Sequence, residues 1–175
     1  MYLRKIAESE GIKVSDDALD ALVHVGEGDM RKAVNSLQVA AASEREITLD
    51  VVYQTSGNAR PEEIIKMLET ALQGNFVEAR ALLDDILLNY GLSGSDIIKQ
   101  IHKGFFDLSI PDEEKVKLID KTGEVEFRIV EGSNERIQLE SLLAYLVLVG
   151  SKRKFVSHQW FEIEFAIIIL RNISC

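Results

Sequence analysis

The chain has 175 residues, is 46% apolar and 28% charged, and carries a formal net charge of −9. This composition is ordinary for a soluble globular protein of one or two small domains. The acidic balance argues against autonomous nucleic-acid binding, which usually depends on a basic face. A single cysteine excludes a disulfide framework and a cysteine-based metal site. Because residues 1–5 lack the apolar core of a signal peptide, we expect a reduced, cytoplasmic setting.

Residues 1–57 contain four short stretches in which apolar side chains recur at helical spacing. They predict helices over residues 2–10, 16–25, 29–42 and from Thr48 to about residue 55. Ser15 and Thr48 are good N-caps, while Gly26 and Gly28 are expected to break the chain between the second and third helices. The sequence therefore predicts a small four-helix bundle, which is too short to be very stable alone.

A polar segment, residues 56–61, ends in a proline suited to the first position of a helix, and is the expected domain boundary. Beyond it, helices are predicted over residues 61–72, 76–88, 96–108, from Pro111 to about residue 122, and over 134–149. Ser95 is the expected N-cap of the third of these. Whether the fourth continues past Gly123 to residue 130 stays open, because a glycine weakens a helix interior.

These helices predict a five-helix bundle over residues 60–152. The fold class is therefore all-α, with two separate bundles and almost no β-structure outside the tail. Residues 153–175 form that tail, and their aromatic and β-branched residues have a strand-like composition. One interpretation is a frame error, or a spliced or engineered end. Another is an extra element that docks on the bundle or on another subunit.

The most informative motif is the run Gly-Asp-Met-Arg at residues 28–31, which leads into the third predicted helix. An arginine in the first turn of a helix is electrostatically unfavourable, because the positive end of the helix dipole favours anions. The same arginine suits an anion that arrives from outside, since backbone N–H groups and a guanidinium then point at one place. The alternative is that Arg31 pairs with Asp29 or Glu27 on a solvated face.

Together with residues 32–38, this motif resembles the sensor 2 helix of AAA+ ATPases in the form G-D-x-R-x-A-x-N-x-L-Q found in clamp loaders. Residues 2–58 resemble the lid domain of a replication factor C small subunit. A second segment, residues 118–140, resembles the end of the collar domain in the archaeal form of this family. The two segments occur in the family's order, and the resemblance extends over residues 1 to about 150. Family chains typically end near the basic residues 151–154, so the tail departs from the pattern.

The resemblance implies that Arg31 reaches the γ-phosphate of ATP held by a preceding domain of the full-length parent. It also implies that Gly28 lets the backbone approach the nucleotide and that Met30 lies beside it. Asp29 and Asn35 are expected to hold the turn and the helix packing. ATP and Mg²⁺ are then cofactors of the parent, which would be a DNA-dependent ATPase that opens a sliding clamp and places it on primer–template DNA.

The resemblance further implies that the collar binds other clamp-loader subunits, so we expect a homo-oligomer. Such contacts need apolar faces beyond those used inside each bundle. The candidates are Ile64, Phe76, Phe105 and Tyr145, for each of which an ordinary core position is the alternative.

No catalytic chemistry is visible in the chain itself. It contains no G-x-x-x-x-G-K-[ST] phosphate loop, and the Ser-Arg-Cys arginine finger of the family is absent. Asp112 and Glu113 follow Pro111 rather than an apolar strand, so we interpret them as first-turn helix residues and not as a Walker B pair. We therefore expect no enzyme activity and no cofactor for these residues alone. The alternative functions are a stand-alone helical scaffold or adaptor and, against the acidic charge, a DNA-binding module.

Overall fold

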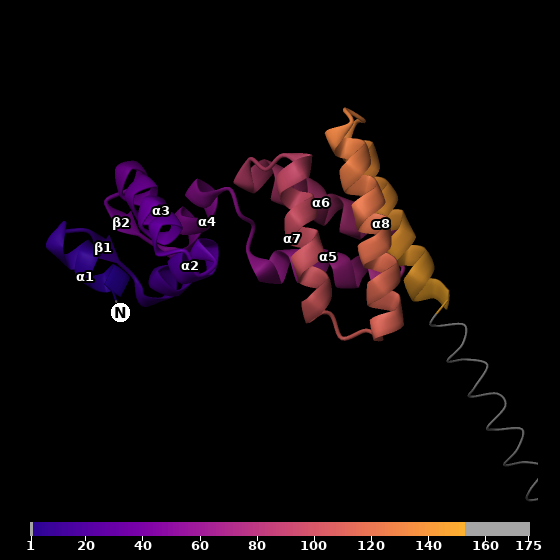
Figure 1. Ribbon diagram of the computed structural model, residues 1–175, viewed down its shortest axis with the longest axis horizontal. Helices are drawn as coiled ribbons and strands as arrows, with labels where there is room; N and C mark the ends of the chain where they lie inside the picture. Colours follow the sequence, from indigo (N-terminus) through magenta and orange to yellow (C-terminus); the bar gives the residue numbers. More distant parts are fainter. Residues whose placement is uncertain (1, 153–175) are drawn as a thin grey trace, which may run out of the picture.

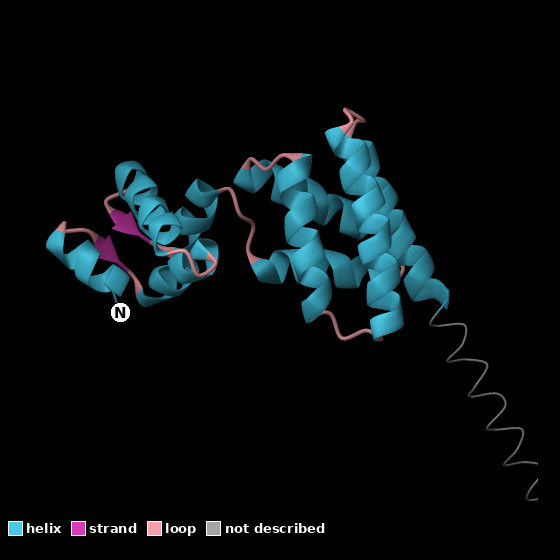
Figure 2. Ribbon diagram, in the orientation of Figure 1, coloured by secondary structure: helices cyan, strands magenta, loops and turns pink. Residues whose placement is uncertain are grey.

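A computed structural model describes residues 2–152. The predicted tail, residues 153–175, lies outside the described residues. Figure 1 shows two helical bundles, the first coloured from indigo to purple and the second from magenta to yellow. Within residues 2–152 the all-α prediction is confirmed, and Figure 2 shows two short strands in the first bundle.

The first bundle contains α1 (Tyr2–Ser9), β1 (Lys13–Val14), α2 (Asp16–Gly26), α3 (Met30–Ser43), β2 (Glu46–Ile47) and α4 (Leu49–Ser56). β1 and β2 pair in parallel, with Lys13 opposite Glu46 and Val14 opposite Ile47. The sequence does not predict this pair, because two residues in a strand are too few to show an alternating pattern. The pairing ties the connection after α1 to the connection after α3, with Ile47 fully buried.

The connection between α2 and α3 differs from the break that the sequence predicts at Gly26. α2 continues through Gly26, where a Cβ would lie only 2.8 Å from the Cβ of Ala33 on α3. This glycine therefore permits a close approach of the two helices. The residue that ends α2 in the left-handed conformation is Glu27, with φ 51°, a conformation that costs a non-glycine residue about 1–2 kcal/mol.

The second bundle contains α5 (Pro61–Leu72), α6 (Phe76–Tyr90), α7 (Gly94–Asp107), α8 (Asp112–Val130) and a fifth helix over residues 135–152. The fifth helix is the unlabelled orange-to-yellow one beside α8 in Figure 1. α7 begins earlier than predicted because Ser93, and not Ser95, is its N-cap, in a reciprocal capping box with Asp96. α8 runs unbroken through Gly123 to Val130, so the longer of the two possible helices is correct.

Each bundle has its own cluster of buried apolar side chains. In the second bundle the fifth helix packs so closely on α5 that a Cβ at Gly150 would overlap the carbonyl oxygen of Leu72. α4 packs against α6, and the half-buried Tyr90 at the end of α6 contacts both clusters. The segment between α4 and α5 contacts both bundles. The N–H of Ala59 donates to Oε1 of Gln100 on α7 at 2.8 Å, and Arg60 pairs with Asp50 on α4.

Candidate functional site

α3 begins with a side-chain cap. A carboxylate oxygen of Asp29 accepts hydrogen bonds from the backbone N–H groups of Arg31, at 2.8 Å, and Lys32, at 3.4 Å. These are two of the four donors that the start of a helix leaves without intrahelical acceptors. Asp29 therefore holds the turn, as predicted. Asn35 is exposed on α3, so the prediction that it contributes to helix packing is wrong.

Arg31 occupies the second position of α3 and is exposed. Within residues 2–152, no hydrogen bond or ion pair engages its guanidinium. The two acids that the alternative interpretation assigns to it bind other groups: Asp29 caps the helix backbone, and Glu27 pairs with Lys32 and Lys103. The alternative pairing is therefore wrong, and the guanidinium stays available at the positive end of the helix.

Gly28 and Met30 lie beside Arg31 at the start of α3. Gly28 has φ 85°, a conformation that favours glycine, and no atom lies within 4 Å of the position where its Cβ would be. Met30 is 47% exposed. The three predicted residues therefore lie together at the exposed start of α3, where the guanidinium of Arg31 is available to an anion.

Among residues 2–152, no three His, Cys, Asp or Glu side chains are grouped closely enough to hold a metal ion. Over the same range, no helix combines the length and the apolar character that crossing a bilayer requires. Asp112 and Glu113 lie in the first turn of α8, as predicted, where acidic side chains complement the helix dipole.

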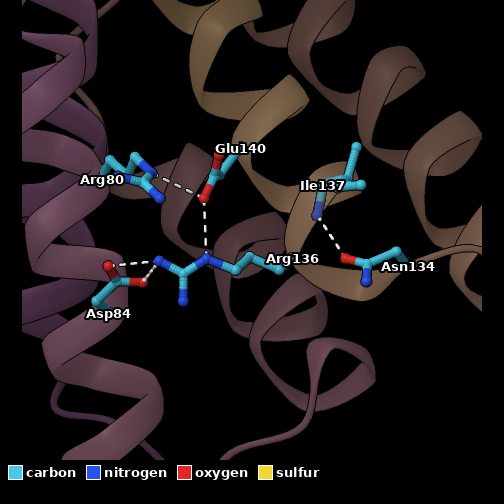
Figure 3. Close-up of polar contacts among 6 residues, drawn as sticks. All are labelled: Arg80, Asp84, Asn134, Arg136, Ile137 and Glu140. Carbon is cyan, nitrogen blue, oxygen red and sulfur yellow. Dashed lines mark hydrogen bonds and ion pairs between the residues drawn. The ribbon is translucent and has the colours of Figure 1, made fainter.

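A second polar cluster joins α6 to the fifth helix (Figure 3). Glu140 accepts hydrogen bonds from Nε of Arg80 at 2.8 Å and from Nε of Arg136 at 3.0 Å, and Arg136 also donates to Asp84 at 2.6 Å. The hydrogen bond from Arg80, reinforced by that from Arg136, lowers the pKa of Glu140 below its usual range. Sequence reasoning missed this cluster because its contacts from Arg80 to Glu140 and from Arg136 to Asp84 join side chains that are more than 50 residues apart in the chain. The cluster fastens the fifth helix to α6.

Comparison with known proteins relates both bundles to one family. A model described as RCF1/5-like, AAA+ ATPase lid domain matches residues 2–42, and the model of the Replication factor C C-terminal domain matches residues 59–145. The Replication factor C small subunit of Methanocella arvoryzae is 48% identical over 151 residues, which are 86% of this chain and 47% of that protein. The small subunits of Archaeoglobus fulgidus and Pyrococcus furiosus are 49% and 51% identical over 150 residues, covering 86% of this chain and 47% and 18% of those proteins.

The chain belongs to the replication factor C small-subunit family. It spans about half the length of the first two of these replication factor C relatives. The lid model covers α1, α2 and all but the last residue of α3, so Arg31 lies in the matched part. The C-terminal domain model extends from Ala59 into the fifth helix, and so covers most of the second bundle. The family resemblance predicted from the sequence is thus confirmed.

Two of the four apolar residues predicted as candidates for contacts between replication factor C subunits are core residues. Ile64 and Phe105 are 2% and 0% exposed and belong to the core, while Phe76 and Tyr145 are half-buried against it. The core alternative is therefore correct for Ile64 and Phe105. The exposed large apolar side chains of the second bundle are Val77 and Leu88 on α6, Phe106 on α7, Val116, Phe127 and Val130 on α8, and Ile137 and Leu148 on the fifth helix.

Proposed function

We propose that this chain is the lid-and-collar part of a cytoplasmic, ATP-driven clamp-loader subunit. In its complete form the protein would open a sliding clamp and place it on primer–template DNA. The first bundle would respond to ATP, and the second bundle, the collar, would join subunits. Membership of the replication factor C small-subunit family and the geometry at the start of α3 support this proposal.

The observation that carries the proposal is the unengaged guanidinium of Arg31 in the first turn of α3. The carboxylates of Asp29 and Glu27 bind other groups, so this cation is available to a ligand. Phosphate oxygens suit this cation, because a guanidinium binds them in bidentate fashion. ATP held by another domain of the complete protein would supply them, with Gly28 and Met30 beside the nucleotide.

These residues alone are expected to bind ATP weakly. A hydrogen bond to a charged group contributes about 1.5–3 kcal/mol, whereas micromolar binding requires about 8 kcal/mol. The Mg²⁺ that accompanies ATP finds no group of three candidate ligands among residues 2–152, and other residues of the complete protein would hold it. Isothermal titration calorimetry measures the affinity. Micromolar binding by the 175-residue chain would refute the proposal, because the phosphate site would then lie within it.

The sensing role of Arg31 is tested in the complete protein. Arg31→Ala should slow ATP-driven clamp loading about 10- to 150-fold, the equivalent of one charge-assisted hydrogen bond. The thermal unfolding midpoint should not change, because the side chain engages no described residue. Arg45→Ala is the matched control, since Arg45 is also an exposed arginine of the first bundle, and it should load clamps normally. Normal loading by Arg31→Ala would contradict the role.

The proposed contact between collars requires two different surfaces. Val77 and Leu88 on α6 are 80% and 81% exposed, and Phe127 and Val130 on α8 are 63% and 66% exposed. α6 packs on α5, whereas α8 packs on α7, so these two pairs of residues lie on helices with different neighbours. A head-to-tail contact between copies joins two different patches, and it generates a ring when the rotation closes.

Sedimentation of the chain at tens of micromolar tests the assembly. We expect an oligomer that Leu88→Asp weakens, because the carboxylate would enter the apolar contact. Val39→Asp is the control, since Val39 is 52% exposed but lies on α3 in the first bundle. A strictly monomeric wild-type chain would contradict the assembly role and would favour the adaptor function instead.

A further inference from the structure

The residue between α2 and α3 has an unusual backbone. Glu27, at φ 51°, is the non-glycine residue with a positive φ among residues 2–152. Glycines stand on both sides of it, with Gly26 inside α2 and Gly28 at φ 85°. A glycine at position 27 would avoid the steric cost of this conformation. A left-handed glutamate between two glycines therefore points to a role for its side chain.

That side chain joins the two bundles. One carboxylate oxygen of Glu27 accepts a hydrogen bond from Nζ of Lys32 on α3 at 2.8 Å, and the other pairs with Nζ of Lys103 on α7. Lys32 follows Arg31 directly in the first turn of α3. One carboxylate thus connects a helix of the second bundle to the turn that carries Arg31.

α7 also holds the segment between the bundles. Gln100, one turn before Lys103, accepts the hydrogen bond from the N–H of Ala59 at 2.8 Å. Glu27, Ala59, Gln100 and Lys103 line one small cavity of about 80 Å³ at the junction. The ion pair and the hydrogen bond therefore belong to a single contact region, in which Ala59 is 3% exposed.

We propose that Glu27 is a positioning residue that latches the first bundle to the second. Through Lys103 it holds the first turn of α3 against α7, and so sets the orientation of Arg31 relative to the collar. The close contact between Gly26 and Ala33 makes α2, the turn and α3 move together, so the latch acts on the whole pair of helices. The latch is a contact within one chain and does not depend on whether Arg31 binds ATP.

The latch is expected to be weak and sensitive to salt. The side chains of Glu27 and Lys103 are 45% and 63% exposed, and ion pairs at such exposure contribute little and are screened by salt. The junction should therefore open in a measurable fraction of molecules. Loss of the latch should raise that fraction about two- to fivefold.

Amide hydrogen exchange at Ala59, followed by NMR on the full chain, reports this opening, because opening releases the N–H from Gln100. Glu27→Gln removes the charge and keeps the backbone cost, whereas Glu27→Gly removes both. Each should speed exchange at Ala59 about two- to fivefold. Leu22 and Leu37 are fully buried in the first bundle, and the protection of their amides from exchange serves as the reference. In Glu27→Gln it should equal that of the wild type, and in Glu27→Gly it should be equal or higher, because glycine adopts the left-handed conformation without strain.

Glu124→Gln is the matched control. Glu124 is likewise 45% exposed and pairs with two cations, Lys121 and Arg128, but it lies on α8. Its substitution should leave exchange at Ala59 unchanged. An equal acceleration in this control would overturn the proposal, because a general change of charge would then explain the result.

The partner residue and salt complete the test. Lys103→Gln should reproduce Glu27→Gln, and the double variant should be no faster than either single variant, as expected for two partners of one interaction. Salt at about 1 M, where the Debye length is about 3 Å, should speed exchange at Ala59 more in the wild type than in Glu27→Gln, because the ion pair between Arg60 and Asp50 is screened equally in both. Unchanged exchange in both Glu27 variants, or additive effects of Glu27 and Lys103, would overturn the latch.

Discussion

The second bundle has one helix glycine with open space around it and one that is tightly packed, so replacing each by alanine tests the packing. At Gly123 on α8, no atom lies within 4 Å of the position of a Cβ. At Gly150 in the fifth helix, a Cβ would overlap the carbonyl oxygen of Leu72 and lie 2.7 Å from its carbonyl carbon. Neither glycine has a positive φ. Alanine at either position therefore gains about 1 kcal/mol of helix propensity, and the difference between the two variants reports packing.

At Gly150 the packing cost should exceed this gain. Ordinary van der Waals contact begins at 3.4 Å, so the carbonyl carbon of Leu72 would have to move from 2.7 to 3.4 Å, a shift of at least 0.7 Å. Leu72 is only 4% exposed and cannot move alone, so α5 and the fifth helix must separate. Overpacking costs about 1–3 kcal/mol, and overlap with a backbone atom belongs at the upper end. We expect Gly150→Ala to lose about 2 kcal/mol and Gly123→Ala to gain about 1 kcal/mol.

Urea denaturation followed by far-UV circular dichroism measures the free energy of unfolding of both variants. The expected difference between them is about 3 kcal/mol, with opposite signs relative to the wild type. Equal stability of the two variants would refute the reasoning, because the fifth helix would then not pack on α5 as the structure places it.

Other substitutions test the remaining contacts. Asp29→Ala should cost about 1 kcal/mol through loss of the N-cap of α3, measured as a lower unfolding midpoint, and an unchanged midpoint would argue against the cap. Phe105→Ala should cost about 3–5 kcal/mol in urea denaturation, because the ring is fully buried in the second bundle; a cost below 1 kcal/mol would contradict that burial. The lowered pKa of Glu140 means that its stabilisation is complete above the ordinary value of 4.5 and is lost as the pH falls through the folded value. Glu140→Gln should therefore be less stable than the wild type at pH 7, by up to about 1 kcal/mol, and the difference should shrink in acid, whereas a difference independent of pH would exclude the ionic explanation.

Helical periodicity was sufficient to predict the number and approximate bounds of the helices, because each has a continuous buried face that local spacing reveals. The errors lie where a long-range contact overrides local preference. The sequence predicts that Gly26 breaks the helix, yet it lies inside α2 because Ala33 packs on it. Gly123 does not interrupt α8, because one exposed glycine costs a long helix only about 1 kcal/mol.

The candidate site was predicted in part. Gly28, Met30 and Arg31 are consecutive or nearly so, so one helix start brings them together without any long-range contact. The bridge from Glu27 to Lys103 could not be predicted, because it joins two bundles and a periodic pattern carries no information about such a pair. A left-handed conformation would have been assigned to a neighbouring glycine rather than to Glu27, since glycine adopts it at no steric cost.

The short connection between the two bundles makes weak contacts between them more effective. Four residues, 57–60, separate α4 from α5, and a segment of that length spans at most about 14 Å. Each bundle is therefore confined near the other at an effective concentration in the millimolar range or above. A half-exposed ion pair is too weak to bring two separate molecules together. At this effective concentration it is strong enough to favour one arrangement of the two tethered bundles. An insertion between residues 57 and 58 would accordingly change the populations at the junction without removing either Glu27 or Lys103.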